Sequence, residues 1–99
     1  MSQPTAQSSF MIAITFEVAA GRQGEMAALI PQEQAHIREL QQQGVVETLY
    51  ISADRSRVWL IMRGASQREV EQTLATFPLY PYMRPVFTEL TPSQEPPAR

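Results

Sequence analysis

The stretch FPLYPYM, residues 77–83, lies between a helical pattern and a strand pattern. It holds three aromatic rings and two prolines, with no charge and no glycine. Connections between a helix and a strand are usually short and polar. Here each proline fixes its own backbone and restricts the residue before it. A stiff, apolar connection of this kind is suited to being covered, either by a second subunit or by a ligand.

The segments on both sides of this stretch have clear periodicities. Alternating apolar residues predict strands over 10–18, 45–52, 57–63 and 83–90, and helical spacing predicts helices over 23–43 and 66–77. Ser66 and Glu69 have the spacing of a capping box, and Gly44 stands where glycine commonly ends a helix. We expect Pro31 to kink the first helix and Pro85 to place the last strand at a sheet edge or a bulge.

The order βαββαβ predicts a ferredoxin-like α+β sandwich, with a four-stranded antiparallel sheet and both helices on one face. This arrangement leaves the second face of the sheet uncovered. Because the first three strands are apolar on both faces, we expect that face to pack against an identical subunit.

The length of 99 residues suits one domain, which we place at residues 10–90 between disordered tails at 1–9 and 91–99. The N-terminus lacks the basic and apolar regions of a signal peptide, and no apolar run is long enough to span a membrane. We therefore expect a cytoplasmic protein without membrane contact. The net charge of −2 is mild and scattered, which argues against binding to nucleic acid.

The residue types that are missing exclude several kinds of chemistry. The chain has no cysteine, which rules out thiol nucleophiles and thiolate metal sites, and its only histidine is His36. All eight basic residues are arginine, so lysine Schiff bases and P-loop phosphate binding are ruled out. We expect neither a metal nor a cofactor.

Glu33 is the leading candidate for a catalytic residue. It projects from the apolar stripe that Met26, Leu29, Ile37 and Leu40 form on the first helix. A carboxyl group in such a place is either paired or desolvated, and desolvation raises its pKa toward the range of a general base. The competing interpretation is structural, with Glu33 capping the sheet rim or paired with an arginine such as Arg57 or Arg84.

His36, one helical turn after Glu33, is a second catalytic candidate because it could orient Glu33 or share a proton with it. The alternative is a boundary histidine that reaches solvent. Arginines near strands could bind a substrate carboxylate, and aromatic side chains could line a pocket, although solvated charges and packing rings are the commoner cases. The candidate substrate-binding residues are Tyr50, Arg57, Trp59, Tyr80, Tyr82 and Arg84, and Arg63 is a further arginine of the same type.

Residues 77–83 resemble the LPLFPYM segment of muconolactone Δ-isomerases, and Leu29, Glu33, Leu40 and Gly44 stand at that family's spacing. The resemblance covers about residues 10–92. It implies ferredoxin-like subunits that pair into dimeric α+β barrels, which in that family assemble further into decamers. It also implies a cofactor-free isomerase of aromatic-compound breakdown that moves a proton on an unsaturated, carboxylated lactone, with Glu33 in the place of the family's helix glutamate.

The chain also departs from the family. Ile30 stands where the family has a lysine, and Val45, Glu47 and Ile51 stand where it has tryptophan and arginine residues. These changes keep a second hypothesis open, a non-catalytic dimeric barrel that binds a small hydrophobic molecule or serves as an accessory subunit. A third, less supported hypothesis is a cofactor-free monooxygenase of the related barrel type.

Overall fold

The computed structural model describes residues 7–91, which form one layer of sheet and one layer of helices. The elements follow the order βαββαβ, with one extra turn of 3₁₀ helix. Their bounds are β1 Ser8–Phe16, α1 Gln23–Gln42, β2 Val46–Ile51, β3 Arg57–Gly64, α2 Gln67–Leu74, η1 Tyr80–Tyr82 and β4 Met83–Leu90. Of the predicted tails at residues 1–9 and 91–99, residues 1–6 and 92–99 lie outside the described part, and Ser8 and Ser9 belong to β1 rather than to a tail.

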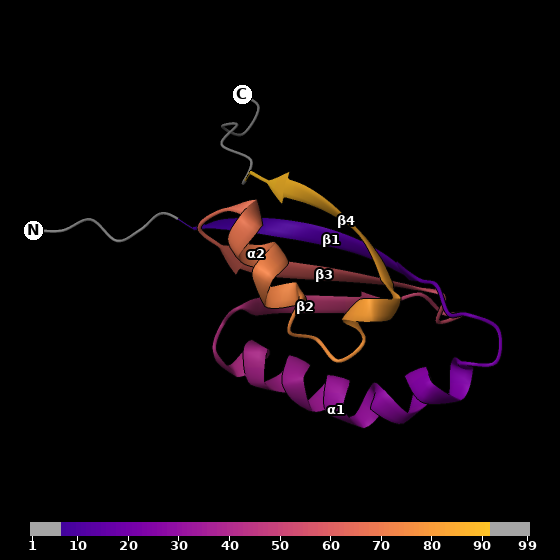
Figure 1. Ribbon diagram of the computed structural model, residues 1–99. Coiled ribbons are helices and arrows are strands. Elements are labelled where there is room, and N and C mark those ends of the chain that lie inside the picture. Colours follow the sequence, from indigo (N-terminus) through magenta and orange to yellow (C-terminus); the bar gives the residue numbers. More distant parts are fainter. Residues whose placement is uncertain (1–6, 92–99) are drawn as a thin grey trace, which may run out of the picture.

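The four strands make one antiparallel sheet in the order β2-β3-β1-β4 (Figure 1). This is the predicted ferredoxin-like topology, and β4 with its Pro85 lies at an edge, as expected. β2 also carries an irregularity between Val46 and Thr48, where Glu47 interrupts its register with β3. Both helices cover one face of the sheet, and the other face is open.

The core lies between the sheet and the helices. Phe10, Ile12 and Ile14 of β1 alternate inward and are almost completely buried. They meet inward residues of the neighbouring strands and the apolar stripes of both helices. The other buried apolar residues are Leu40, Val46, Leu60, Met62, Val70, Leu74, Phe77, Leu79 and Met83.

The helix ends follow local sequence signals. Gly44 has φ 78°, and the N–H groups of Gly44 and Val45 donate to the carbonyls of Gln41 and Leu40. This is the Schellman arrangement, which glycine favours at that position. At the start of α2, the Ser66 hydroxyl accepts from the Glu69 N–H at 3.2 Å, while the Glu69 carboxylate accepts from the Ala65 N–H at 2.8 Å rather than from Ser66 itself.

Several predicted boundaries differ from the structure by one to three residues. β1 starts at Ser8 instead of residue 10, because Ser8 and Ser9 still find partners in Gly64, Arg63 and Leu90. α2 ends at Leu74 instead of residue 77, since the turn before Pro78 tightens to bonds over three residues. By contrast, α1 is unbroken at Pro31, as expected for one helix whose apolar stripe keeps its phase.

Candidate functional site

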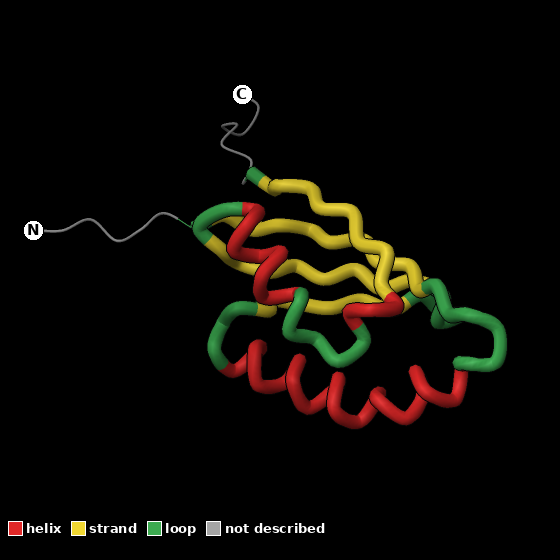
Figure 2. The backbone as a smooth tube through the Cα atoms, viewed as in Figure 1, coloured by secondary structure: helices red, strands yellow, loops and turns green. Residues whose placement is uncertain are grey.

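Residues 77–83, the segment after α2, return toward α1 before β4 begins. In Figure 2 the connection after α2 loops toward α1, and the short turn η1 then leads into β4. The backbone N–H of Leu79 donates to Oε1 of Glu33 at 3.0 Å, in a buried bond between residues far apart in the sequence. The stiff segment is therefore anchored to the helix by the residue that the sequence predicts as a base.

Glu33 is 7% exposed and is the one buried charged residue of the described part. Burial raises the pKa of its carboxyl, while the Leu79 hydrogen bond and the charge of His36 act in the opposite direction to a smaller extent. Within residues 7–91 every fully buried side-chain nitrogen or oxygen has a hydrogen-bond partner. The Leu79 N–H bonds only Oε1 of Glu33. Oε2 of Glu33, which has no hydrogen bond in the described part of the chain, therefore keeps some exposed surface, and Glu33 lines the neighbouring cavity.

That cavity lies between α1 and the sheet and has a volume of about 270 Å³. Its size is near the lower limit for ligand sites, so it suits a small molecule. Glu33, Gln34 and Arg55 are its polar side chains. The apolar lining consists of Ile14, Phe16, Met26, Ile30, Ile37, Leu49, Ile51, Val58, Leu60, Leu79 and Met83.

The cavity has a buried floor and an exposed mouth. Glu33, Leu60 and Leu79 are among its buried residues, whereas Ile51 and Arg55 are exposed. A ligand in the cavity would thus meet a desolvated carboxyl group at one end and a cation at the other. A carboxyl group in such surroundings can act as a base toward a carbon acid.

His36 turns toward α2 and does not line this cavity. Its Nε2 lies 2.8 Å from the Thr76 hydroxyl, its Nδ1 lies 3.8 Å from the Glu39 carboxylate, and its ring meets Phe77 edge to face. The contacts with Thr76 and Phe77 fasten α1 to the residues just before Pro78. In the structure, Glu33 and His36 therefore form no hydrogen bond with each other. The charge of His36 acts on Glu33 only by lowering the pKa of its carboxyl to a small extent.

The predicted substrate-binding residues lie away from the cavity around Glu33. Arg57, Trp59, Tyr50 and Arg84 belong to the open face of the sheet, since Trp59 pairs with Ala13 and Tyr50, and Thr15 pairs with Arg57 and Arg84. Arg84 pairs with Glu17, which corrects the structural alternative that Glu33 pairs with Arg57 or Arg84. Tyr80 and Tyr82 form η1 outside the cavity, whereas Leu79 and Met83 of the same segment line it.

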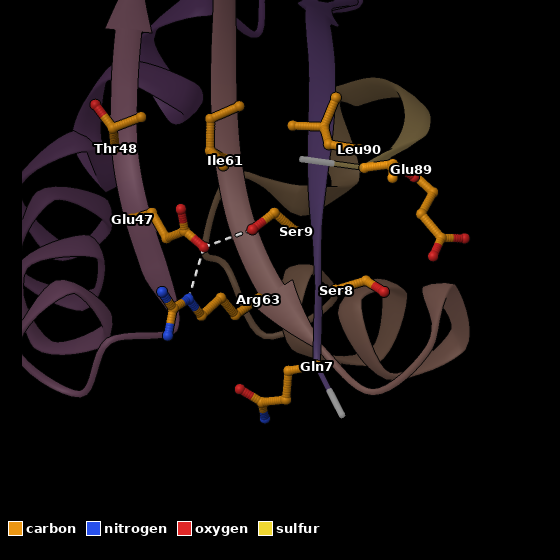
Figure 3. A pocket seen from close by; sticks show the side chains of 10 residues that line it. Gln7, Ser8, Ser9, Glu47, Thr48, Ile61, Arg63, Glu89 and Leu90 are labelled. Carbon is orange, nitrogen blue, oxygen red and sulfur yellow. Dashed lines mark hydrogen bonds and ion pairs between the residues drawn. The ribbon is translucent and has the colours of Figure 1, made fainter. Parts of the chain in front are cut away.

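A wider depression of about 980 Å³ lies on the open face of the sheet, at the end near Ser9 (Figure 3). Glu47 accepts hydrogen bonds at 2.7 Å from both the Ser9 hydroxyl and Arg63, which lower the pKa of the Glu47 carboxyl. The charges of Glu47 and Arg63 in this depression therefore satisfy each other. A paired, well-ionised carboxylate is a poor proton acceptor, so we place the candidate active site at Glu33 and not here.

Arg55, like Gln34, is a polar cavity residue that the sequence did not indicate. It sits in the turn between β2 and β3, where no periodic pattern indicates a direction. The dipeptide Asp54-Arg55 between Ser52 and Ser56 is a turn signal, and only the spatial closeness of this turn to α1 makes Arg55 a site residue.

Comparison with known proteins bears on the same segments. The family model for muconolactone delta-isomerase matches residues 9–95. The chain belongs to the muconolactone delta-isomerase family. No individual curated protein matches it. The family match confirms the predicted family and agrees with the observed fold.

No helix in residues 7–91 has the length and apolar character needed to cross a membrane. The same part of the chain holds no cluster of three or more histidine, aspartate or glutamate residues arranged to hold a metal ion.

Proposed function

We propose that this protein is a cofactor-free isomerase that moves a proton between two carbons of a small unsaturated lactone, or a related carboxylated product of aromatic-compound breakdown. Glu33 is the general base of the proposed reaction. The observation that supports this most is the placement of its carboxyl group: it lies on the buried floor of an apolar cavity, with Oε1 held by the Leu79 N–H.

The proposed reaction needs only one base, which removes a proton from one carbon of the substrate and delivers a proton to another. The Glu33 carboxylate removes a proton from the carbon next to the unsaturated carbonyl system, and the electrons of that C–H bond pass into the conjugated carbonyl. The resulting dienolate takes a proton back from the Glu33 carboxyl group at another carbon, which shifts the double bond. Substrate and product have the same atoms and oxidation level, so no co-reactant is needed.

The surroundings of Glu33 suit this task. Burial raises the pKa of its carboxyl and so increases its strength as a base, while the Leu79 N–H keeps the ionised form accessible. Apolar walls exclude water that would compete for the proton. The Gln34 side chain, which lines the same cavity, offers a neutral N–H donor to the oxygen that gains negative charge.

We also propose that two copies of the chain pack sheet to sheet into a dimeric α+β barrel. The open face carries neighbouring rows in which Trp59 pairs with Ala13 and Tyr50, and Ile61 pairs with Met11 and Thr48. Arg63 and Arg84 of the same face are paired with glutamates. Apolar rows bordered by satisfied charges support a sheet-to-sheet interface.

The test is proton exchange in D₂O, followed by NMR on a five-membered unsaturated lactone that carries a carboxymethyl group. Glu33→Gln keeps an oxygen for the Leu79 N–H but removes the base, so we expect at least about a hundredfold loss of exchange with the fold intact. Glu25→Gln, an exposed position on the same helix, is the control and should exchange like the wild type.

Normal exchange in Glu33→Gln would remove this residue from the mechanism. A wild-type protein that binds the lactone without exchanging its protons would instead support the second hypothesis, a non-catalytic binding protein. The two results are separated by measuring binding and exchange on the same samples.

A further inference from the structure

Arg55 differs from the other arginines of the described chain in lining the cavity that contains Glu33. It lies at the exposed mouth with Ile30, Gln34 and Ile51, while Glu33 lies at the buried floor. The two residues form no ion pair within 4.0 Å. The cavity therefore keeps its positive and negative groups apart.

Within residues 7–91, no carboxylate pairs with the Arg55 guanidinium. Arg22, Arg63 and Arg84 each pair with a glutamate. Within residues 7–91, the Arg55 side chain makes neither an ion pair nor a hydrogen bond; only its backbone N–H is bonded, to the Ser52 carbonyl at 2.8 Å. A guanidinium without a partner at the mouth of an apolar cavity is suited to receive an anion.

The turn that carries Arg55 is held by its own side chains. The Asp54 carboxylate accepts from the hydroxyls of Ser52 and Ser56, each at 2.7 Å, and from the Ser56 N–H at 3.0 Å. The Ser52 hydroxyl in turn accepts from the Arg57 N–H at 3.0 Å.

Arg55 itself has φ 64°, a left-handed conformation that glycine, asparagine and aspartate adopt more readily than arginine. An arginine kept in this conformation by a braced turn is a reason to look for a function of its side chain.

We propose that Arg55 binds the carboxylate of the ligand at the cavity mouth and so sets both the ligand class and its orientation. The ligand class is a small, largely apolar monoanion. Its carboxylate meets Arg55, its apolar part fills the space between α1 and the sheet, and its acidic carbon reaches Glu33. The reverse orientation is disfavoured because it would bring a carboxylate against the Glu33 carboxyl group. The part of this proposal that concerns the acidic carbon rests on the function proposed above.

The experiment measures binding by calorimetry or NMR titration with two probes, the lactone that carries a carboxymethyl group and the same lactone with a carboxamide in its place. The wild type should prefer the carboxylate. Arg55→Gln should lose about tenfold to a hundredfold in affinity for the carboxylate probe, with unchanged affinity for the carboxamide.

Two further variants make the result independent of folding. Arg55→Gly suits the positive φ, so it should fold at least as well as the wild type and lose the same affinity. Arg68→Gln removes an exposed arginine of α2 and should bind both probes like the wild type.

The proposal is overturned if Arg55→Gln and Arg55→Gly bind the carboxylate probe as the wild type does, or if Arg57→Gln is the variant that loses the affinity. Binding and exchange separate this proposal from the proposed function. Loss of carboxylate binding in the Arg55 variants of a protein without exchange would uphold the Arg55 site and reject the isomerase. Exchange in the wild type, together with unchanged carboxylate binding and unchanged exchange in the Arg55 variants, would uphold the isomerase and reject the Arg55 site.

Discussion

The two faces of the sheet differ in how their charged groups are satisfied. On the open face, Glu47 is bonded to Ser9 and Arg63, and Arg84 is paired with Glu17. On the face covered by the helices, Glu33 has one backbone hydrogen bond and the Arg55 side chain has none within residues 7–91. The covered face therefore has a buried carboxyl group and a cation available for a ligand, whereas the charged groups of the open face within residues 7–91 are paired, Arg57 excepted.

This difference supports the two proposals made above, one for each face of the sheet. Polar or charged groups that have no partner within the protein lower its stability. They are candidates for substrate binding or catalysis, because the substrate can supply the missing partner. Groups that the chain satisfies by itself are compatible with an interface, where unpaired charges would oppose association. We therefore propose that the reaction takes place on the covered face and self-association on the open face, and the predictions below test both proposals.

The largest effect should come from a charge placed in the middle of the open face. Ile61 pairs with Met11 and Thr48 at the centre of the sheet, so Ile61→Arg would bring two like charges together in a sheet-to-sheet dimer. We expect a cost of about 3 kcal/mol or more, which corresponds to more than a hundredfold in the dissociation constant. Light scattering after size exclusion should show monomers at concentrations where the wild type is a dimer.

The control for that variant is Gln72→Arg, which adds the same charge on an exposed position of α2. It should leave the oligomer unchanged. An Ile61→Arg protein of wild-type size, or a wild type that is a monomer at all concentrations, would contradict the assignment of the open face to self-association.

The sequence predicted the fold because several independent signals agreed. Alternation in β1, the capping box at Ser66 and the glycine at position 44 each fixed one element or one end of it. Their order then allowed the ferredoxin-like topology. The boundaries that were wrong, at Ser8 and Leu74, depend on neighbours that are distant in the sequence or on the geometry of a final turn, which periodicity does not report.

The site was predicted only in part. Glu33 could be found because it interrupts an apolar helical stripe, and the structure places it on the cavity floor. Arg57 and Trp59 could not be placed because β3 is apolar on both faces, so alternation alone does not say which face the helices cover. Arg55 lies in a turn whose position against α1 depends on the complete fold.

A smaller effect, on stability, should follow from the raised pKa of Glu33. Its pKa in the folded protein lies above the ordinary value of 4.5, so above pH 4.5 the folded state binds more protons at this site than the unfolded state. The contribution of Glu33 to stability is therefore fully present below pH 4.5 and is lost as the pH rises through the folded-state pKa. Each tenfold change in the acidity constant corresponds to about 1.4 kcal/mol.

Glu33→Gln removes this titration and keeps an acceptor for the Leu79 N–H. Relative to the wild type, the variant should gain free energy of unfolding as the pH rises from 4 to 8, measured by urea denaturation at each pH. A difference between the two proteins that stays constant over this range would mean that the Glu33 carboxyl is freely hydrated.

The smallest effect should come from the turn that presents Arg55. The bonds from Ser56 and Ser52 lower the pKa of Asp54 to about 2, so the brace is present at neutral pH and is lost as the pH falls from about 4 through about 2. Asp54→Ala removes the brace while keeping Arg55, and we expect about a threefold loss in affinity for the carboxylate probe, because a looser turn must be ordered on binding. Asp54→Asn, which keeps one acceptor oxygen, should lose less. Equal and large losses in both variants would mean that the charge of Asp54, and not the order of the turn, governs binding at the cavity mouth.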